Sequence, residues 1–324
     1  MGGNAPEGMH PRDALGNHGG GAPILDLGQG FDEARGPVDS RGARAYKAEM
    51  PPVSFLKMHG LGNDVVVIDA REGAVPIGPR LAKALADRHR GIGCDHVLRL
   101  DPAEDADVFL SIWNSDGDEV AACGNGTRCV ARWLMDRKGA GKVTIRTRAG
   151  ALACEDAGHG RVAVDMGGPR FAWRDVPLAR AADTANLDLG RLDLGPAMAL
   201  GMGNPHAVFF VADPEAIDVA AIGVELEHHA IFPERANIGF ARVLEANRLR
   251  LRVWERGAGL TQACGTGACA AAVAASRRGL TGRTVTVVLD GGPLDIHWRA
   301  DDHVVMTGPA VTVFDGAFDP AAFA

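Results

Sequence analysis

The sequence has few of the features that mark membrane, nucleic-acid-binding or secreted proteins. Its most apolar long run, Ala263 to Ser276, covers about fourteen residues, fewer than the roughly twenty needed to span a bilayer. No run of basic residues is present, and 34 Lys and Arg against 41 Asp and Glu give a formal charge of −7. We therefore expect neither nucleic acid nor a membrane as a partner. No secretory apolar region lies near the start.

The six cysteines are not arranged as a disulfide framework. They are spread over the chain at positions 94, 123, 129, 154, 264 and 269. Such usage is typical of a protein kept in a reducing compartment, so a cytoplasmic location is predicted. Cys94, Cys129, Cys154 and Cys269 are expected to be small buried side chains. Their spacings do not match a zinc site, and no metal is predicted.

The first 49 residues differ in composition from the rest. They are rich in Gly, Pro and charge, so they are predicted to be a disordered extension. An alternative interpretation places the start of translation at Met50. The remaining chain has a globular composition, 46% hydrophobic and 23% charged over the full sequence, and is long enough for two domains.

From Val53 onward, short apolar runs separated by Gly and charged residues predict strands. The predicted strands cover 53–60, 64–70, 96–100, 108–113, 143–150, 161–167, 206–211, 238–244, 248–254, 284–289, 294–298 and 303–308. Helices are predicted near 78–89, 123–139, 218–229 and 266–279, with Gly139 as a C-cap. The charged stretch "ELEHH", Glu225 to His229, is expected to face solvent.

An internal repeat is visible at an offset of 141 residues. This offset relates Cys123 to Cys264 and Trp113 to Trp254, and it also relates Asn63 in "GND" to Asn204 in "GNP". The glycines after the two cysteines match at the same offset, and "DMGGP" matches "VMTGP" at 140. Several motifs in register predict a duplicated domain.

Each repeat places a cysteine before Gly-X-Gly at the start of a predicted helix. Cys123 begins "CGNG" and Cys264 begins "CGTG". A helix N-terminus lowers the pKa of a thiol, and its free N–H groups can hold a carboxylate. Two such thiols facing each other across a cleft could invert a carbon, because one removes a proton while the other delivers one. The backbone N–H groups would stabilise the negative charge that builds on the substrate carboxylate.

These motifs together resemble the diaminopimelate epimerase family. The resemblance is carried by "KMHGLGNDVVVID", "GIGCDHVL", "NSDGDEVAACGNGTRC", "GNPHAVFF" and "ERGAGLTQACGTGACAAA", in the family's order from Ser54 to the end. It implies an enzyme of lysine and peptidoglycan precursor biosynthesis that interconverts LL- and meso-diaminopimelate without pyridoxal phosphate or another cofactor. It also implies a homodimer.

The resemblance assigns the site residue by residue. Cys123 and Cys264 match the acid/base thiols, His206 matches a histidine thought to assist proton transfer, and Glu255 is placed in both the catalytic and the binding set. The implied substrate-binding residues are Asn63, His96, Asn114, Gly124, Asn125, Asn204, Asn237, Glu255, Arg256, Gly265 and Thr266. One position departs from the family, which normally shows Gln where "GCDHV" has His96. An imidazole cannot present the donor and acceptor of an amide at the same reach.

The expected fold class is α+β, with two pseudo-symmetric domains that each wrap a curved mixed sheet around a central helix. The active site is expected in the cleft between them. We place the first domain at 50–168 and the second at 169–310, with a final strand at about 311–324 that returns to the first.

Two other functions are compatible with paired thiols. One is a different two-thiol racemase or epimerase, acting on proline or hydroxyproline. The other is a redox or binding protein in which Cys123 and Cys264 form a reversible disulfide. A substrate with a second polar end is favoured by Glu255, Arg256 and the asparagines, and diaminopimelate is such a substrate.

Overall fold

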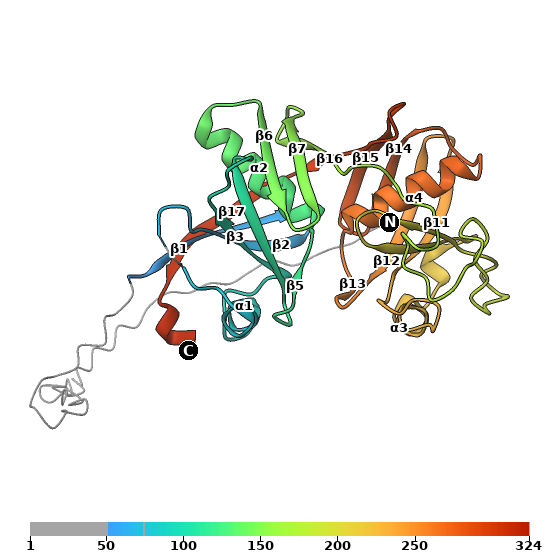
Figure 1. The fold of residues 1–324 in the computed structure, drawn as a ribbon, viewed down its shortest axis with the longest axis horizontal. Helices are drawn as coiled ribbons and strands as arrows, with labels where there is room; N and C mark the ends of the chain where they lie inside the picture. The colour runs from blue at the N-terminus through green and yellow to red at the C-terminus, as the bar shows by residue number, and fades with distance from the viewer. Residues whose placement is uncertain (1–50, 74, 324) are drawn as a thin grey trace, which may run out of the picture. The chain divides into compact units, whose positions relative to one another are not determined.

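The two halves of the chain fold into the same succession of strands and helices (Figure 1). The computed structural model describes residues 51–73 and 75–323, which belong to one compact unit. The strands of the first half are β1 (Val53–Gly60), β2 (Asn63–Asp69), β3 (His96–Asp101), β4 (Val108–Asn114), β5 (Glu119–Val120), β6 (Lys142–Thr147), β7 (Gly150–Asp156) and β8 (Arg161–Asp165). Those of the second half are β9 (Met198–Gly201), β10 (Pro205–Phe210), β11 (Asn237–Glu245), β12 (Arg248–Glu255), β13 (Gly259–Leu260), β14 (Thr284–Leu289), β15 (Gly292–Trp298) and β16 (Val304–Pro309), and β17 (Val311–Phe318) follows them.

The helices follow the same repeat. The first half holds α1 (Pro79–Ala86) and α2 (Gly124–Lys138), and the second holds α3 (Val219–Glu227) and α4 (Gly265–Arg277). Two short 3-10 helices, η1 (Pro214–Ala216) and η2 (Pro320–Phe323), complete the element order. All four predicted helices are therefore present, although α1 ends before the predicted limit. It stops at Ala86 because Asp87 is extended and accepts hydrogen bonds from the N–H groups of His89 and Arg90.

Strand pairing confirms the predicted duplication. In the first half β1 pairs with β2, β2 with β3, β3 with β4, β4 with β6, β6 with β7 and β7 with β8. The second half repeats this order from β9 to β16. The parallel pairs also correspond: β2–β3 matches β10–β11, and β4–β6 matches β12–β14. Even the register is kept, since Val97 faces Trp113 and Ile238 faces Trp254. The α+β class with two similar domains is thus confirmed.

A long buried helix lies at the centre of each half. Every residue of α4 from Gly265 to Ala275 is buried, and most are alanine, which combines high helix propensity with a small cross-section. The other central helix, α2, ends at Gly139, whose left-handed conformation (φ 61°) lets its N–H bond to the Met135 carbonyl. One hydrophobic core contains side chains of both helices and of the sheets around them.

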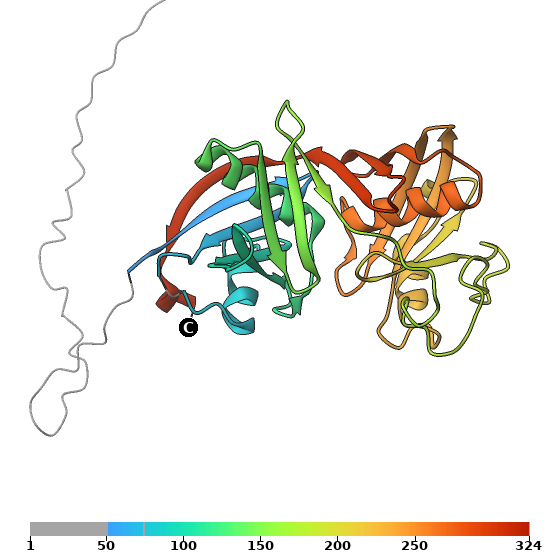
Figure 2. The ribbon, with the colours of Figure 1, turned by 45° about the horizontal axis from the view of Figure 1, so that its top comes forward.

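The halves are joined by pairing between their last strands. β8 lies antiparallel to β16, so the sheet is continuous from one half to the other. The chain then returns along β17, which pairs with β1 over a register from Val53↔Phe318 to His59↔Val311. Figure 2 shows β16 and β17 crossing from the second half back to the first.

Several features differ from the sequence expectations, among them the two-residue strands β5 and β13, which were not predicted. Strands β7 and β9 were not predicted, because "ALACED" ends in acidic residues and "MALG" has no alternation of apolar and polar residues. Glu227 of "ELEHH" is buried instead of solvent-facing. The prediction of a disordered extension at 1–49 falls outside the residues that the structure describes. Within the described residues, no helix is long and apolar enough to cross a membrane.

Candidate active site

The two cysteines are the N-cap residues of the two central helices. Cys123 precedes α2 and accepts a hydrogen bond at Sγ from the N–H of Gly126 at 3.4 Å. Cys264 precedes α4 and accepts the corresponding bond from Gly267 at 3.3 Å. Both N-cap backbones are extended, which is what lets the side chain turn back toward the first helical turn. Each sulfur therefore sits where a helix N-terminus favours negative charge.

The starts of the two helices face each other closely. A Cβ added to Gly124 would lie 3.8 Å from the Gly265 Cα, and one added to Gly265 would lie 3.6 Å from the Gly124 Cα. Met306 of β16 packs against both, at 2.9 Å from the Cβ position of Gly265 and 3.0 Å from that of Gly124. The two helix starts are therefore within van der Waals reach of each other with Met306 packed beside them, and this approach brings the N-cap thiols to one region between the halves.

The Cys123 sulfur has polar neighbours from its own half. It lies 3.9 Å from His96 Nδ1 and 4.0 Å from Asn63 Oδ1, and all three residues are buried. Burial alone would raise the pKa of Cys123, but the positive charge and hydrogen bond of His96, with the Gly126 N–H, lower it below its ordinary value. Burial alone would likewise lower the pKa of His96, but the thiolate, Glu255 and Asp95 raise it to about 9. Each group of the pair thus favours the charged form of the other, the thiolate of Cys123 and the imidazolium of His96.

The Cys264 sulfur has different neighbours. Its partner at 3.6 Å is the Thr266 hydroxyl, and the Glu255 carboxylate lies close enough to act on it. Burial, followed by the negative charge of Glu255, raises the pKa of Cys264 well above its ordinary value. Burial also raises the pKa of Glu255, even though Thr261 donates a hydrogen bond to it. This side of the site therefore favours a protonated thiol.

The side chains of Asn63 and Asn125 are hydrogen-bonded to other groups of the protein. Asn63 Nδ2 donates to Asp95 Oδ2 at 2.9 Å, and its Oδ1 accepts from Asn125 Nδ2 at 3.1 Å. Asn125 Nδ2 also donates to the Ala263 carbonyl at 2.6 Å, and its Oδ1 accepts from Arg128 at 2.8 Å. Both polar ends of Asn125 are occupied, so its side chain holds the two halves together.

Asn204, His206 and Asn237 are the buried or partly buried polar side chains on this side of the second half. His206 Nε2 lies 2.8 Å from Asn204 Oδ1, and Asn204 Nδ2 donates to the Thr266 hydroxyl at 3.3 Å. Asn237 donates to the Pro205 carbonyl at 2.9 Å and accepts from the Arg256 N–H at 2.9 Å. Burial, with a smaller effect of Arg256, lowers the pKa of His206 to about 3, so this imidazole is neutral.

The remaining predicted residues lie at the ends of neighbouring strands. Asn114 ends β4 opposite His96 in the register, and Glu255 ends β12. The Arg256 guanidinium donates to the Glu234 carbonyl at 3.1 Å. The two sulfurs are thus contacted by His96 and Asn63 in the first half and by Thr266 and Glu255 in the second, while Asn114 lies beside His96 and the Arg256 guanidinium is bonded to Glu234.

Two carboxylates near the site were missed from the sequence. Asp95 links Asn63 to Arg88, at 2.9 and 2.8 Å, and accepts from the Asp64 N–H at 3.1 Å, while the Asp64 carboxylate accepts from Arg88 and Lys57. Glu227 is 3% exposed and accepts from Trp254 Nε1 at 2.7 Å and from the Gly257 N–H at 2.9 Å, which fixes the turn after Glu255. The burial of Glu227 could not be predicted from the sequence, because its neighbours in "ELEHH" are mostly polar or charged.

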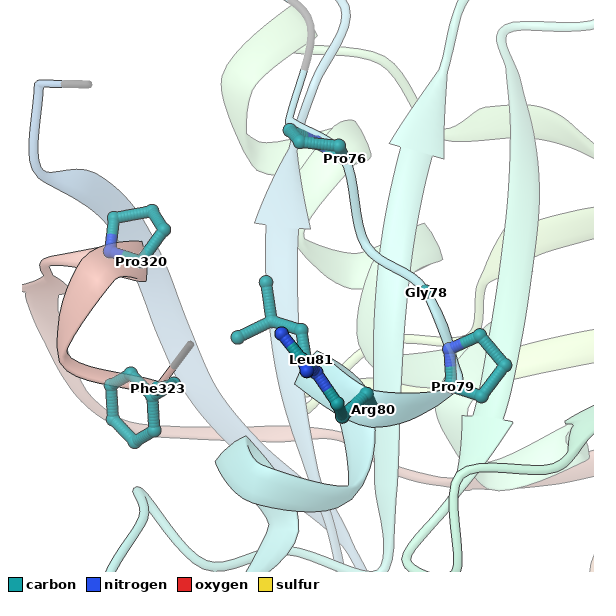
Figure 3. Close-up of a pocket in the computed structure, with 7 residues that line it drawn as sticks. All are labelled: Pro76, Gly78, Pro79, Arg80, Leu81, Pro320 and Phe323. Carbon is teal, nitrogen blue, oxygen red and sulfur yellow. The ribbon is translucent and has the colours of Figure 1, made fainter. Parts of the chain in front are cut away.

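A surface hollow of about 310 Å³ is separate from these residues. It is lined by Pro76, Gly78, Pro79, Arg80, Leu81, Pro320 and Phe323. Figure 3 shows η2 on one side of it and the start of α1 on the other, and none of the candidate site residues lines it. In the described residues, no group of three or more His, Cys, Asp or Glu side chains is placed to hold a metal ion.

Comparison with known proteins identifies the family. A model of the diaminopimelate epimerase family matches residues 55–172 and 198–313. The chain belongs to the diaminopimelate epimerase family. Diaminopimelate epimerases from Rhodospirillum centenum and Phenylobacterium zucineum are 54% and 55% identical to it over 264 and 268 residues. These matches cover 81% of this chain in both cases and 91% and 96% of the relatives.

Solved structures share the fold at much lower identity. A hydroxyproline epimerase from Agrobacterium vitis with bound trans-4-hydroxy-L-proline has a TM-score of 0.63 at 17% identity, covering 84% of this chain and 94% of that one. A phenazine biosynthesis protein of the PhzF family from Bacillus anthracis has a TM-score of 0.60 at 15% identity, covering 83% and 99%. The diaminopimelate epimerase family therefore shares its two-domain architecture with proteins of other specificities.

Proposed function

We propose that this chain interconverts LL- and meso-diaminopimelate by proton transfer at one α-carbon between Cys123 and Cys264. Family membership supports the reaction and the substrate. The observation that carries the mechanism is the approach of two helix starts, each capped by a cysteine that accepts an N–H bond from its own helix. The rival redox function and the proline-type substrates have no such support from the relatives.

In the proposed reaction each thiol serves one face of the substrate. A thiolate takes the α-proton, and the bonding electrons pass to the α-carbon and the adjoining carboxylate. The opposite thiol then gives its proton to the other face, so the configuration is inverted and the charge has moved from one sulfur to the other. N–H groups at the starts of α2 and α4 hold the substrate carboxylate as its charge rises.

The environments of the two sulfurs set the starting protonation. The pKa of Cys123 is lowered and that of Cys264 is raised, so Cys123 starts as base and Cys264 as acid. The reverse reaction uses the thiols in the opposite roles, as microscopic reversibility requires. Arg256 is a candidate for the carboxylate at the far end of the substrate, because a guanidinium binds a carboxylate with two parallel hydrogen bonds.

The test is incubation of the pure protein with LL-diaminopimelate in heavy water, without added pyridoxal phosphate. We expect meso product that carries one deuterium from solvent at the inverted carbon. Product without solvent deuterium would contradict the two-thiol mechanism. L-proline and trans-4-hydroxy-L-proline are the comparison substrates, and turnover of either in preference to diaminopimelate would contradict the proposed specificity.

We also propose a cytoplasmic homodimer. The six cysteines are free and buried, which suits a reducing compartment. In the described residues β17 pairs only with β1, and it exposes Val311, Val313 and Phe314 at 43–54%. An apolar edge strand of this kind needs cover, and a second copy would supply it. Sedimentation of the wild type and of V313K tests this, with a monomeric wild type as the contradicting result.

A further inference from the structure

Each half of the molecule carries one histidine in the same pair of parallel strands, but on opposite members of the pair. In the first half Val65 of β2 lies beside His96 of β3, and in the second His206 of β10 lies beside Asn237 of β11. Val65 corresponds to His206 and His96 to Asn237 at the offset of 141. The repeat therefore holds two imidazoles that are not equivalent by position.

Only the first of these imidazoles contacts a thiol. His96 Nδ1 lies 3.9 Å from Cys123 Sγ, within the limit for a hydrogen bond to sulfur, and both side chains are buried. The Nε2 of His206 is instead directed to Asn204 Oδ1 at 2.8 Å. Cys264 has the Thr266 hydroxyl and Glu255 as neighbours. The site thus pairs one thiol with an imidazole and the other with a carboxyl group.

We propose that His96 is a catalytic residue that exchanges a proton with Cys123, beyond the substrate-binding role that its position implies. Nδ1 accepts the proton of the Cys123 thiol, which leaves a thiolate beside an imidazolium, and the thiolate then removes the substrate proton. When the reaction runs in the opposite direction, the same imidazolium holds the thiolate that remains after Cys123 has given up its proton. The role of His96 in turnover rests on the proposed two-thiol reaction, because the imidazole acts through Cys123.

The charged groups around His96 support this exchange. Asp95 precedes it in the chain, Glu255 approaches from β12, and Cys123 approaches from the start of α2. Asp95 is itself held by Asn63 and Arg88, at 2.9 and 2.8 Å. These groups make the surroundings of His96 negative and so stabilise its protonated form against the effect of burial. An amide at this position could not carry the proton, since it has no basic nitrogen.

The decisive measurement is the ionisation of Cys123 in the substrate-free protein. Thiolate absorbance near 240 nm is recorded against pH for the wild type and for H96Q, and the C123S curve in each background is subtracted. The other buried thiols do not interfere below pH 10, because burial raises the pKa of Cys94, Cys129, Cys154 and Cys269 to about 12. H206Q is the matched control, as it removes the corresponding imidazole of the other half.

We expect H96Q to move the Cys123 midpoint upward by about 1–3 pH units, the shift that an opposite charge at this distance produces. H206Q should leave the midpoint within a few tenths of a unit. An unchanged midpoint in H96Q overturns the proposal. Near-ultraviolet circular dichroism establishes that H96Q folds, and H96N replaces it if it does not. No substrate is present in this titration. An unchanged Cys123 midpoint in H96Q is therefore a different result from a failure of the wild type to epimerise diaminopimelate.

Discussion

The side-chain amide of Asn125 donates a hydrogen bond of 2.6 Å to the carbonyl of Ala263, the residue before Cys264. The loop that carries one catalytic candidate is thus held by a residue two positions after the other. Asn125 is fixed in turn by Arg128, a fully buried guanidinium. The relative placement of the two thiols is therefore supported by a buried amide that crosses between the halves, in addition to the packing of the helix starts and the pairing of β8 with β16.

Replacing Asn125 tests this link. N125A removes the donor to the Ala263 carbonyl and one of the three acceptors of the Arg128 guanidinium, which keeps Pro309 and Met306, and buried unsatisfied groups cost about 1–3 kcal/mol. We expect a loss of that size in the free energy of unfolding, measured by denaturant titration, and a fall in kcat. N186A removes an exposed asparagine and should change stability by less than about 0.5 kcal/mol. Equal behaviour of the two variants would show that the link contributes nothing.

The cysteines should be separately essential. C123S and C264S each remove one proton carrier, so epimerisation is expected to fall by about 10²–10⁴-fold, the range for general acid–base catalysis. Thermal midpoints should stay close to that of the wild type, because serine is similar in size. Chiral chromatography of the product gives the rate, and near-normal turnover by either variant argues against inversion between two thiols.

The close approach of the helix starts should be intolerant of a methyl group. In G265A the new Cβ would lie 2.9 Å from Met306 Sδ and 3.6 Å from the Gly124 Cα. Overpacking of this kind costs about 1–3 kcal/mol, and we expect kcat/KM to fall with it. G282A is the control, since nothing lies within 4 Å of its Cβ position. If both variants have wild-type stability and rate, the helix starts are not tightly packed in solution.

The turn that carries Arg256 should depend on Glu227. E227Q weakens the acceptor of the Trp254 and Gly257 N–H groups, so we expect a stability loss of about 1–2 kcal/mol and a higher KM. E225Q, on the exposed face of the same helix, loses only a surface contact with Arg191 and should cost under about 1 kcal/mol. Steady-state kinetics distinguish the two, and a KM for E227Q equal to that of E225Q would show that the turn is held by other contacts.

Acid should destabilise the first half through Asp64. Burial alone would raise the pKa of Asp64, but hydrogen bonds from Arg88 and Lys57 lower it from 3.8 to about 2. Because the folded-state pKa is depressed, this carboxylate stabilises the fold above the unfolded value, and the effect is lost as pH falls from about 4 to 2. D64N should lose on the order of 2 kcal/mol at pH 7 and show a flatter decline in that interval. E104Q, an exposed change, should keep the wild-type profile.

Much of the fold could be predicted because the local patterns agree with the tertiary structure. Strand β1 and strand β14 have the predicted bounds, and Gly139 ends α2 in the expected conformation. Strands β7 and β9 were missed for different reasons. The first is acidic at its end, and the second is four buried residues in an irregular region.

The site was predictable in its residues and less so in their contacts. The cysteines at the helix starts follow from spacing, because an N-cap thiol before Gly-X-Gly is a local feature. The engagement of Asn125 with Ala263, and of His96 with Cys123, joins residues 138 and 27 positions apart. Such contacts depend on how the strands are ordered in the sheet, which the spacing of motifs does not give.

Pairing between β8 and β16 has the geometry of an isologous interface contained in one chain. Asp165 faces Val305, its counterpart at the offset of 140, and the positions on either side of this pair bond reciprocally: Val164 faces Met306, and the Met166 N–H donates to the Val304 carbonyl. Identical subunits meeting in this way must keep identical residues on both sides. A covalent connection removes that constraint, so one half can hold His96 and Asn114 where the other holds Asn237 and Glu255. The two amino acid ends of one substrate can then be treated differently by a framework that is symmetric in its backbone.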